Sequence, residues 1–452
     1  MKKNLISLAA MALSSLMLSC SSSEDDVDLG EAKQVINMLS EPIPINLTPE
    51  QRTFAYDNNQ FTLNFLKTVN ETESNGKSFI YSPLSITYVL GMVNDAATGL
   101  TEKELEETLG FHEGGIQAVN DYCKKLIDGL PKVDDKVTLN IANAIFLNKN
   151  YTLKPQFEQD MQTYYDAKAE ALDFKAPETL NHINSWASEK TNGMIPTILD
   201  DIDPLMVSYL LNAIYFKADW ASKFDLKNTK NETFTPENGN SSTDIPMMHQ
   251  NVLIQYINNS MFSAIKIPYG NGLWNMMVML PEKGFTTDHI INHLAALGLN
   301  GVEGAFCEIV DGIATMSVKS FSPYEVDLKL PRFETSSDTD KLDTGEPNKM
   351  KGLISIMQKM GINRAFIDGM AEIPNMCEYP LYIAMMRQKA KIKVNEEGSE
   401  AAAVTVAGVS FKSASGPIEY PKATFHANRP FVYVIQEASS GVILFVGKFT
   451  GK

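Results

Sequence analysis

The stretch 396–411, EEGSEAAAVTVAGVSF, constrains the fold of this chain more than any other. After Glu400 it carries no charge and no proline, and its side chains up to Ser410 are small or β-branched. Such residues make a poor helix core, whereas every backbone N–H can join a ladder because proline is absent. Gly398 provides a hinge at the start. The stretch is therefore predicted to be a strand that can insert into an existing sheet, with one face formed by Ser399, Ala401, Ala403, Thr405, Ala407 and Val409.

Composition narrows the class of protein. The 452 residues carry 39 basic and 55 acidic side chains, which gives a formal net charge of −16. Such a surface repels phosphate backbones, so nucleic acid is not expected as a partner. Neither a disulfide framework nor a metal site is indicated by the spacing of the four cysteines, Cys20, Cys123, Cys307 and Cys377. Buried free thiols are the favoured interpretation, one bridge among the last three stays open, and no cofactor is expected.

The N-terminus is predicted to direct export. Residues 1–19 have two lysines and then an apolar run too short to span a bilayer well, as in a signal peptide. The segment 17–20, MLSC, resembles a bacterial lipobox, which implies cleavage before Cys20 and lipid attachment to its sulfur. Residues 20–48 would then be the lipidated cysteine and a flexible linker, acidic at its start. A plain secretory signal with an incidental cysteine is the alternative.

The lipobox, and the acidic residues 24–26 that resemble a surface-export signal of Gram-negative lipoproteins, imply a location. We expect an exported lipoprotein of a Gram-negative bacterium, held in the outer membrane and facing the cell surface. Periplasmic or secreted forms are the alternatives. The chain would contact the membrane through its lipid anchor alone.

Periodicity and turn signals predict an alternation of helices and strands. Ser82 is expected to start a helix with Pro83 in its first turn, and Thr101 to cap another with Glu104 in a capping box. Further helices are predicted at 54–69, 151–166, 180–192, 287–297 and 351–360. Strands are predicted at 79–81, 140–146, 207–217, 263–269, 274–281, 381–394, 431–436 and 442–449.

No residue pattern points to catalysis. Ser82 and Ser85 lack the GxSxG frame of a hydrolase nucleophile. His289 and His293 are spaced i, i+4 and could place two metal ligands on one helix face, but no HExxH glutamate accompanies them. A packing or surface role is favoured for both histidines, and the chain is not expected to be an enzyme.

Three motifs together resemble the inhibitory serpins. They are SPLSI at 82–86, LLNAIYFKADW at 210–220, and a block from NEEGSEAAAVTVAG at 395–408 to FHANRPFVYVI at 425–435. The resemblance spans about residues 50–450. It implies an α+β serpin domain at 49–452 with three β-sheets, eight to nine helices and an exposed reactive-centre loop at about 396–424. It also implies a monomer.

The resemblance implies irreversible, suicide-substrate inhibition of serine proteases. A protease attacks a bait bond in the loop and forms an acyl-enzyme, and the cleaved loop inserts as a strand into the main sheet before the ester can be hydrolysed. Counting fourteen residues from Gly398 makes Lys412–Ser413 the scissile bond, which suits a trypsin-like protease. Phe411 is the alternative and suits a chymotrypsin-like pocket. Papain-like cysteine proteases are secondary targets.

The resemblance also assigns residues around the loop. A "shutter" beneath the main sheet contains Ser82, Ser85, Asn212 and Gln388, and a "breach", where insertion begins, contains Trp220. Gln388 departs from the histidine common in the family, and a glutamine cannot titrate near neutral pH. The hinge consists of Glu396, Glu397, Gly398, Ser399, Glu400, Ala401, Ala402 and Ala403.

Two other functions compete with inhibition. A non-inhibitory serpin would act as a binding protein, and a bulky residue or proline in the hinge would favour it, but the hinge has neither. A surface hydrolase would need a paired-carboxylate or triad site, to which nothing in the chain commits. The segment 413–424 is longer than the usual return from the loop, and no basic helix indicates activation by a heparin-like cofactor.

Overall fold

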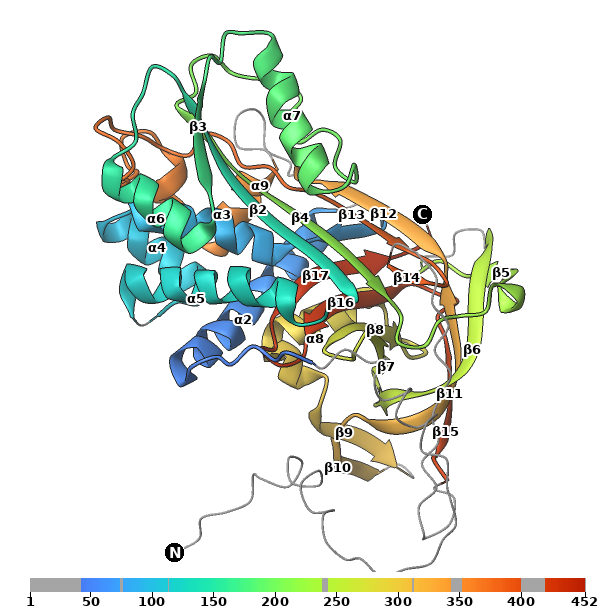
Figure 1. The fold of residues 1–452 in the computed structure, drawn as a ribbon. Coiled ribbons are helices and arrows are strands. Elements are labelled where there is room, and N and C mark those ends of the chain that lie inside the picture. The colour runs from blue at the N-terminus through green and yellow to red at the C-terminus, as the bar shows by residue number, and fades with distance from the viewer. Residues whose placement is uncertain are drawn as a thin grey trace, which may run out of the picture. The chain divides into compact units, whose positions relative to one another are not determined.

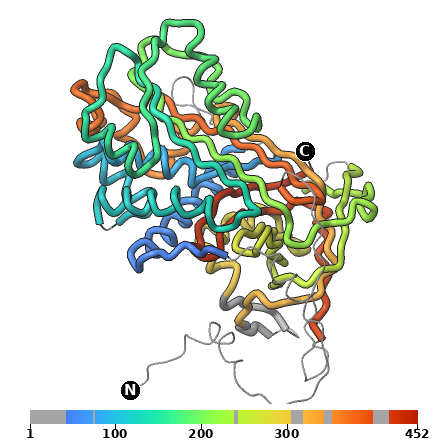
Figure 2. The backbone as a smooth tube through the Cα atoms, viewed as in Figure 1, coloured from blue at the N-terminus to red at the C-terminus, as the bar shows by residue number. Residues whose placement is uncertain are grey.

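The structure is a computed structural model. It describes residues 42–73, 76–112, 114–237, 243–310, 313–342, 352–399 and 419–451, with the backbone alone for 304–310 and 313–317. Ser40–Lys452 form one compact unit. Its chain path can be followed in Figure 2.

A six-stranded sheet contains the expected insertion site (Figure 1). Its two long central strands pair antiparallel along their whole length, from Val137 opposite Ala218 to Leu147 opposite Ser208. The strands in spatial order are β12 (Phe333–Asp338), β13 (Lys389–Val394), β14 (Gly398–Ser399), β4 (Ser208–Asp219), β2 (Val137–Asn148) and β3 (Lys168–Leu172).

A nine-stranded sheet packs against it, and a two-stranded sheet, β9 (Gly304–Val310) with β10 (Ile313–Lys319), is separate. Phe216 of β4 joins the two large sheets, because its ring lies 5.3 Å from Trp274 and 5.5 Å from Tyr269, edge to face. The nine strands follow the order β1 (Phe79–Tyr81), β17 (Ile443–Phe449), β16 (Phe431–Glu437), β8 (Trp274–Pro281), β7 (Phe262–Tyr269), β6 (Thr243–Asn258), β11 (Ser322–Pro331) and β15 (Lys422–His426), with β5 (Lys230–Phe234) on β6.

Eight α-helices lie within the described residues. They are α2 (Pro49–Thr72), α3 (Pro83–Ala96), α4 (Gly99–Leu109), α5 (Gly115–Gly129), α6 (Pro155–Tyr165), α7 (Glu178–Lys190), α8 (Thr287–Leu297) and α9 (Leu353–Met360). Short 3-10 turns occur at η1 (Leu130–Lys132), η2 (Leu226–Asn228), η4 (Gly298–Gly301), η5 (Thr339–Lys341) and η6 (Arg364–Phe366). Among the described residues, no helix is both long and apolar enough to cross a membrane.

Opposite faces of the six-stranded sheet are covered by different helices. Side chains alternate along β4, so Tyr209 and Leu211 point one way and pack with α7, while Asn212 points the other way and bonds to α3. In Figure 1, α7 accordingly lies on one side of β2 and β4, and α3 on the other. We call these the α7 face and the core face.

Helix starts follow the predicted chemistry at one place and not at another. Ser82 caps α3, since its hydroxyl accepts from the Ser85 N–H. The predicted Thr101 cap is wrong: α4 begins at Gly99, and the Glu372 carboxylate accepts from the Leu100 and Thr101 N–H groups at 2.9 and 3.3 Å. A distant carboxylate therefore performs the role assigned to a local capping box.

The other elements predicted above are present, with one shortened strand. Of the run 381–394, only Lys389–Val394 forms β13. The residues before it bond elsewhere, because the Ile383 N–H donates to the Ala365 carbonyl and Gln388 exchanges bonds with Thr339. These lateral bonds keep the segment out of the ladder.

Candidate functional site

The hinge is a tight turn that joins β13 to β14. Asn395 and Gly398 exchange backbone hydrogen bonds of 2.9 and 3.2 Å, with Glu396 and Glu397 at the tip. The Asn395 side-chain oxygen also accepts from the N–H groups of Glu397 and Gly398. Ser399 then lies between Val394 of β13 and Ala218 of β4. The first two residues of the predicted inserting strand are thus already paired in the sheet.

Gly398 is required by this geometry. Its φ is +151°, which L side chains rarely adopt. A Cβ there would lie 2.6 Å from the Asp219 Cα and would also collide with the Ala218 carbonyl. Any other residue would push β14 away from β4.

Trp220, which the family resemblance assigns to the breach, contacts the hinge. Its N–H donates to the Glu397 carbonyl at 2.8 Å, and its indole N–H to the Asn395 carbonyl at 2.9 Å. The indole stacks on Tyr269 with ring centroids 4.3 Å apart, and the Tyr269 hydroxyl lies 2.8 Å from the Ser399 hydroxyl. The aromatic pair therefore supports both sides of the turn.

The two hinge carboxylates are held by ion pairs. The Glu396 side chain is buried, with 7% of the residue exposed. Its carboxylate accepts hydrogen bonds from Nε and Nη2 of Arg332, and from the Thr229 hydroxyl at 2.6 Å. Burial opposes ionisation, but Arg332 and Thr229 outweigh it and hold the pKa of Glu396 below its ordinary value. Glu397 pairs with Lys223 at 2.6 Å, and Lys223 also reaches Asp219.

Below the hinge, the described strands form no ladder between β4 and β13. From Lys217 to Ser208 the only described ladder partner of β4 is β2, and from Lys389 to Lys393 the only described partner of β13 is β12. Among the described strands, none but β14 pairs with both β4 and β13. We call the interval between these edges of β4 and β13 the strand gap.

The predicted shutter residues meet at the start of α3. Gln388 spans the backbone of Ser82, accepting from its N–H at 3.1 Å and donating to its carbonyl at 2.7 Å. The Ser82 hydroxyl donates to the Leu444 carbonyl at 2.8 Å. A neutral amide can make this two-way bridge because it is both donor and acceptor.

The same network continues to the other side of the strand gap. The Ser85 hydroxyl bonds to the Asn212 side-chain oxygen, and the Asn212 amide donates to Asn143 at 2.8 Å. Asn143 donates in turn to the Tyr165 carbonyl at 2.6 Å. The four shutter residues are therefore linked by hydrogen bonds: Ser82 caps α3 and Ser85 lies in it, while Gln388 and Asn212 come from opposite sides of the gap.

Several predicted residues lie outside the described part of the chain. These are the hinge residues Glu400, Ala401, Ala402 and Ala403, the bait residues Phe411, Lys412 and Ser413, and the lipidation residue Cys20. Cys123 and Cys377 are buried free thiols, and no side chain is described for Cys307. His289 bonds to Thr286, and His293 to the Gly301 carbonyl.

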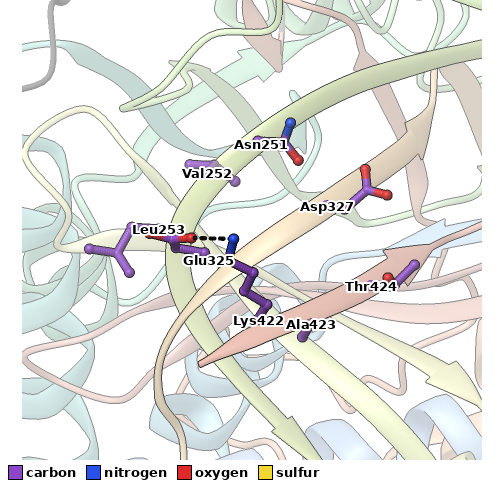
Figure 3. Close-up of a pocket in the computed structure, with 8 residues that line it drawn as sticks. All are labelled: Asn251, Val252, Leu253, Glu325, Asp327, Lys422, Ala423 and Thr424. Atoms are coloured by element: carbon purple, nitrogen blue, oxygen red, sulfur yellow. Dashed lines mark ion pairs between the residues drawn. The ribbon is translucent and has the colours of Figure 1, made fainter. Parts of the chain in front are cut away.

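The chain returns from the loop region into β15, beside a depression of about 780 Å³ on the nine-stranded sheet (Figure 3). Its lining includes Lys422 of β15 and Glu325 of β11, an ion pair at 3.8 Å. Asp327 next to them bridges His249 of β6 at 2.7 Å and His426 of β15 at 3.0 Å. These polar contacts fasten the returning strand to the sheet.

The sequence interpretation missed the partners that hold the hinge. Arg332, Thr229, Lys223, Tyr269 and Asn143 all contact predicted site residues, but each is far away in the chain. One signal was present: two adjacent acids at a strand turn call for cationic partners if they are buried. Nothing in the sequence indicates which basic residues these are.

Comparison with known proteins gives one consistent result. Residues 56–451 match the family model described as Serpin (serine protease inhibitor). Serpin B6 of Macaca fascicularis is 30% identical over 402 residues, covering 88% of this chain and 98% of its own. The native structure of tengpin, a thermophilic serpin, covers 92% of this chain and 98% of its own, with a TM-score of 0.71 and 24% identity. The structure of human thyroxine-binding globulin covers 88% of this chain and 98% of its own, with a TM-score of 0.71 and 25% identity.

Proposed function

The chain belongs to the serpin family, which confirms the resemblance and the fold expected from its motifs, and on this premise we propose that it is a suicide-substrate inhibitor of serine proteases. A protease cleaves the reactive loop and becomes esterified to it, and the loop then inserts into the strand gap before the ester is hydrolysed. The chain itself supplies no catalytic group and acts as an inhibitor.

One observation carries the proposal: β14 already pairs with β4 and β13 at the top of the strand gap. Continuing the register of Ser399 opposite Ala218 one residue at a time would bring Ala403 opposite Ile214 and Thr405 opposite Asn212. The small side chains from Ser399 to Val409 would then lie on the core face. Insertion would give the edges of β4 and β13 the ladder partners that no described strand provides below β14.

We propose Lys412–Ser413 as the scissile bond, with Phe411 as the alternative P1-type residue. A lysine there suits a trypsin-like protease, whose specificity pocket holds a buried carboxylate. Chymotrypsin-like serine proteases and papain-like cysteine proteases are secondary candidates.

We further propose that the protein acts as a monomer, and that it is exported and anchored in the outer membrane by lipid on Cys20. Labelling of wild type and of a Cys20→Ser variant with a radioactive fatty acid would test the lipid anchor.

Incubation of residues 24–452 with trypsin tests the inhibitory mechanism. We expect a band at the summed mass that survives boiling in detergent, and a released C-terminal peptide that begins at Ser413. A Lys412→Ala variant is the matched control and should lose the band with trypsin. Cleavage without any covalent band, with trypsin and with chymotrypsin-like proteases alike, would overturn the proposal.

The main competitor is a non-inhibitory binding protein. Its basis is that one structural neighbour is a thyroxine-binding globulin. Such a protein would be cut without trapping the protease, and its heat stability need not rise after cleavage. A hydrolase is the weaker alternative, and it predicts turnover of an ester or peptide substrate that a serpin would not show.

A further inference from the structure

The α7 face of the strand gap is crossed by the segment between α7 and β4. Ile198 and Leu199 of this segment are buried against Tyr209 and Leu211 of β4, in a cluster that Met385, on the far side of the gap, also contacts. Figure 2 shows the segment running from α7 back to β4. It therefore covers the lower part of the path along which the cleaved loop would insert.

This segment is fixed to α7 by one side chain. The Asn184 oxygen accepts from the N–H groups of Ile198 and Leu199 at 2.7 and 2.9 Å, and its amide donates to the Leu199 carbonyl at 2.9 Å. Three bonds to two consecutive residues leave the segment little freedom to shift on its own. The residue that follows, Asp200, is thereby held at a set position.

Asp200 pairs with cations from the opposite side of the strand gap. Its carboxylate lies 2.7 Å from the Arg387 guanidinium and 3.3 Å from the Lys389 ammonium. Arg387 is 6% exposed and makes a second, two-bond pair with Asp338 of β12. The hydrogen bond from Arg387 holds the pKa of Asp200 below its ordinary value, so Asp200 is ionised at neutral pH.

The pair lies at a definite level of the proposed insertion. Continuing the two observed registers, Val394–Ser399 and Ser399–Ala218, would bring Val406 between Arg387 and Leu211, and Val404 beside Lys389. Both valines would face α7, since residues two apart share a face with Gly398. They are the largest apolar residues on that face between Gly398 and Ser410, and they would have to pass beneath Asp200.

We propose that Asp200, positioned by Asn184, bridges the strand gap through its ion pairs with Arg387 and Lys389, and that the cleaved loop must break these pairs to insert. We call this bridge the strap. The strap would slow insertion and so would set how many cleavage events end in trapping. Asp200 is thus a positioning residue for the inhibitory reaction. The proposal rests on the proposed function, but the strap can be tested without a protease.

The test uses a synthetic peptide with the sequence of residues 399–410, which should anneal into the strand gap of the intact protein. Annealing is followed by the shift on a native gel and by the rise in thermal midpoint. We expect Asp200→Asn to accelerate annealing about five-fold, as loss of an ion pair with an exposed carboxylate allows. Asp201→Asn removes the same charge one residue away and should stay within two-fold of wild type. Equal rates for wild type and Asp200→Asn, or no annealing by either, would overturn the strap.

Ionic strength and trypsin provide two further readouts. At 1 M NaCl the difference between wild type and Asp200→Asn should shrink, because salt screens the exposed Asp200 carboxylate. With trypsin, Asp200→Asn should consume fewer inhibitor molecules per trapped protease at an unchanged rate of first attack. If wild type traps no protease while Asp200→Asn still accelerates peptide annealing, the proposed function fails and the strap stands. Trapping that is unchanged in Asp200→Asn would count against the strap alone.

Discussion

At the scale of single residues, the hinge is specified by contacts that the local sequence only half reveals. The sequence predicts a hinge at Gly398, and the structure gives a reason for glycine there, because its φ is +151° and a Cβ would meet Asp219. The roles of the two acids depend on Arg332 and Lys223, which are brought to the hinge by the fold. A side chain's own neighbours can be predicted from sequence, whereas its long-range partners cannot.

The buried hinge carboxylate should contribute stability that depends on pH. The folded pKa of Glu396 lies below its ordinary value of 4.5, so the stability is present above that pH and is lost as pH falls through the folded pKa. At pH 7, Glu396→Gln should destabilise by roughly 1–3 kcal/mol, as for a charged hydrogen bond. Thermal melts should show this difference shrinking as pH falls below the ordinary value of 4.5. Glu397→Gln is the control, and an equal loss in both variants would contradict the prediction.

A second carboxylate should act in the opposite direction. Asp95 of α3 is 7% exposed, and burial raises its pKa to about 6, against a hydrogen bond from Asn120 that favours the charged form. Between its ordinary pKa of 3.8 and about 6, the folded state binds a proton that the unfolded state has released. Stability therefore falls as pH rises through this window.

Asp95→Asn should accordingly be more stable than wild type at pH 7.5, by up to about 3 kcal/mol at the usual 1.4 kcal/mol for each pKa unit. The asparagine can still accept from Asn120. The gain should diminish as pH is lowered toward 4, and the exposed Asp135→Asn should show no such gain. Thermal midpoints at both pH values measure this, and a less stable Asp95→Asn at pH 7.5 would disprove it.

At the scale of elements, strong periodicity located most helices and strands, and tertiary contacts decided the exceptions. The run 381–394 has strand composition, but its first half bonds to Ala365 and Thr339 instead of a ladder. Similarly, α4 begins where Glu372 can cap it, not where Thr101 could. Both outcomes depend on residues that the local pattern does not contain.

The alternation of β4 predicts which loop positions must stay small. Ala403 would lie opposite Ile214 on the core face, where an ionised side chain cannot be solvated. We expect trypsin to cleave Ala403→Glu at the wild-type rate. The yield of covalent complex should fall by more than about ten-fold, because slower insertion loses to deacylation. A ten-fold change corresponds to roughly 1.4 kcal/mol in the difference between the two barriers. The control Ser415→Glu lies beyond the scissile bond and should trap normally. Wild-type complex yield from Ala403→Glu would rule out insertion in this register.

At the scale of the whole molecule, three motifs were enough to predict the fold, because their order along 350 residues fits one known architecture. They could not predict the strand gap. Whether β4 and β13 pair with each other depends on the balance between their own ladder and the contacts of the hinge, the shutter and Asp200. That balance depends on contacts between segments that are far apart in the sequence, so no single segment predicts it.

On the proposed mechanism, the intact chain is not in its most stable state. Insertion of the residues after Ser399 would form roughly ten ladder hydrogen bonds at about 1 kcal/mol each, and would bury the small side chains of the core face. Cleavage in the loop should therefore raise the thermal midpoint by at least about 10 °C, since 1 kcal/mol shifts a large domain by a few degrees or less. Differential scanning calorimetry of intact and loop-cleaved protein measures this. Loop-cleaved Ala403→Glu is the matched control, because it has the same broken bond but a strand that cannot enter. An equal rise in both would assign the stabilisation to release of the loop, whereas a rise in wild type alone would assign it to the filled gap.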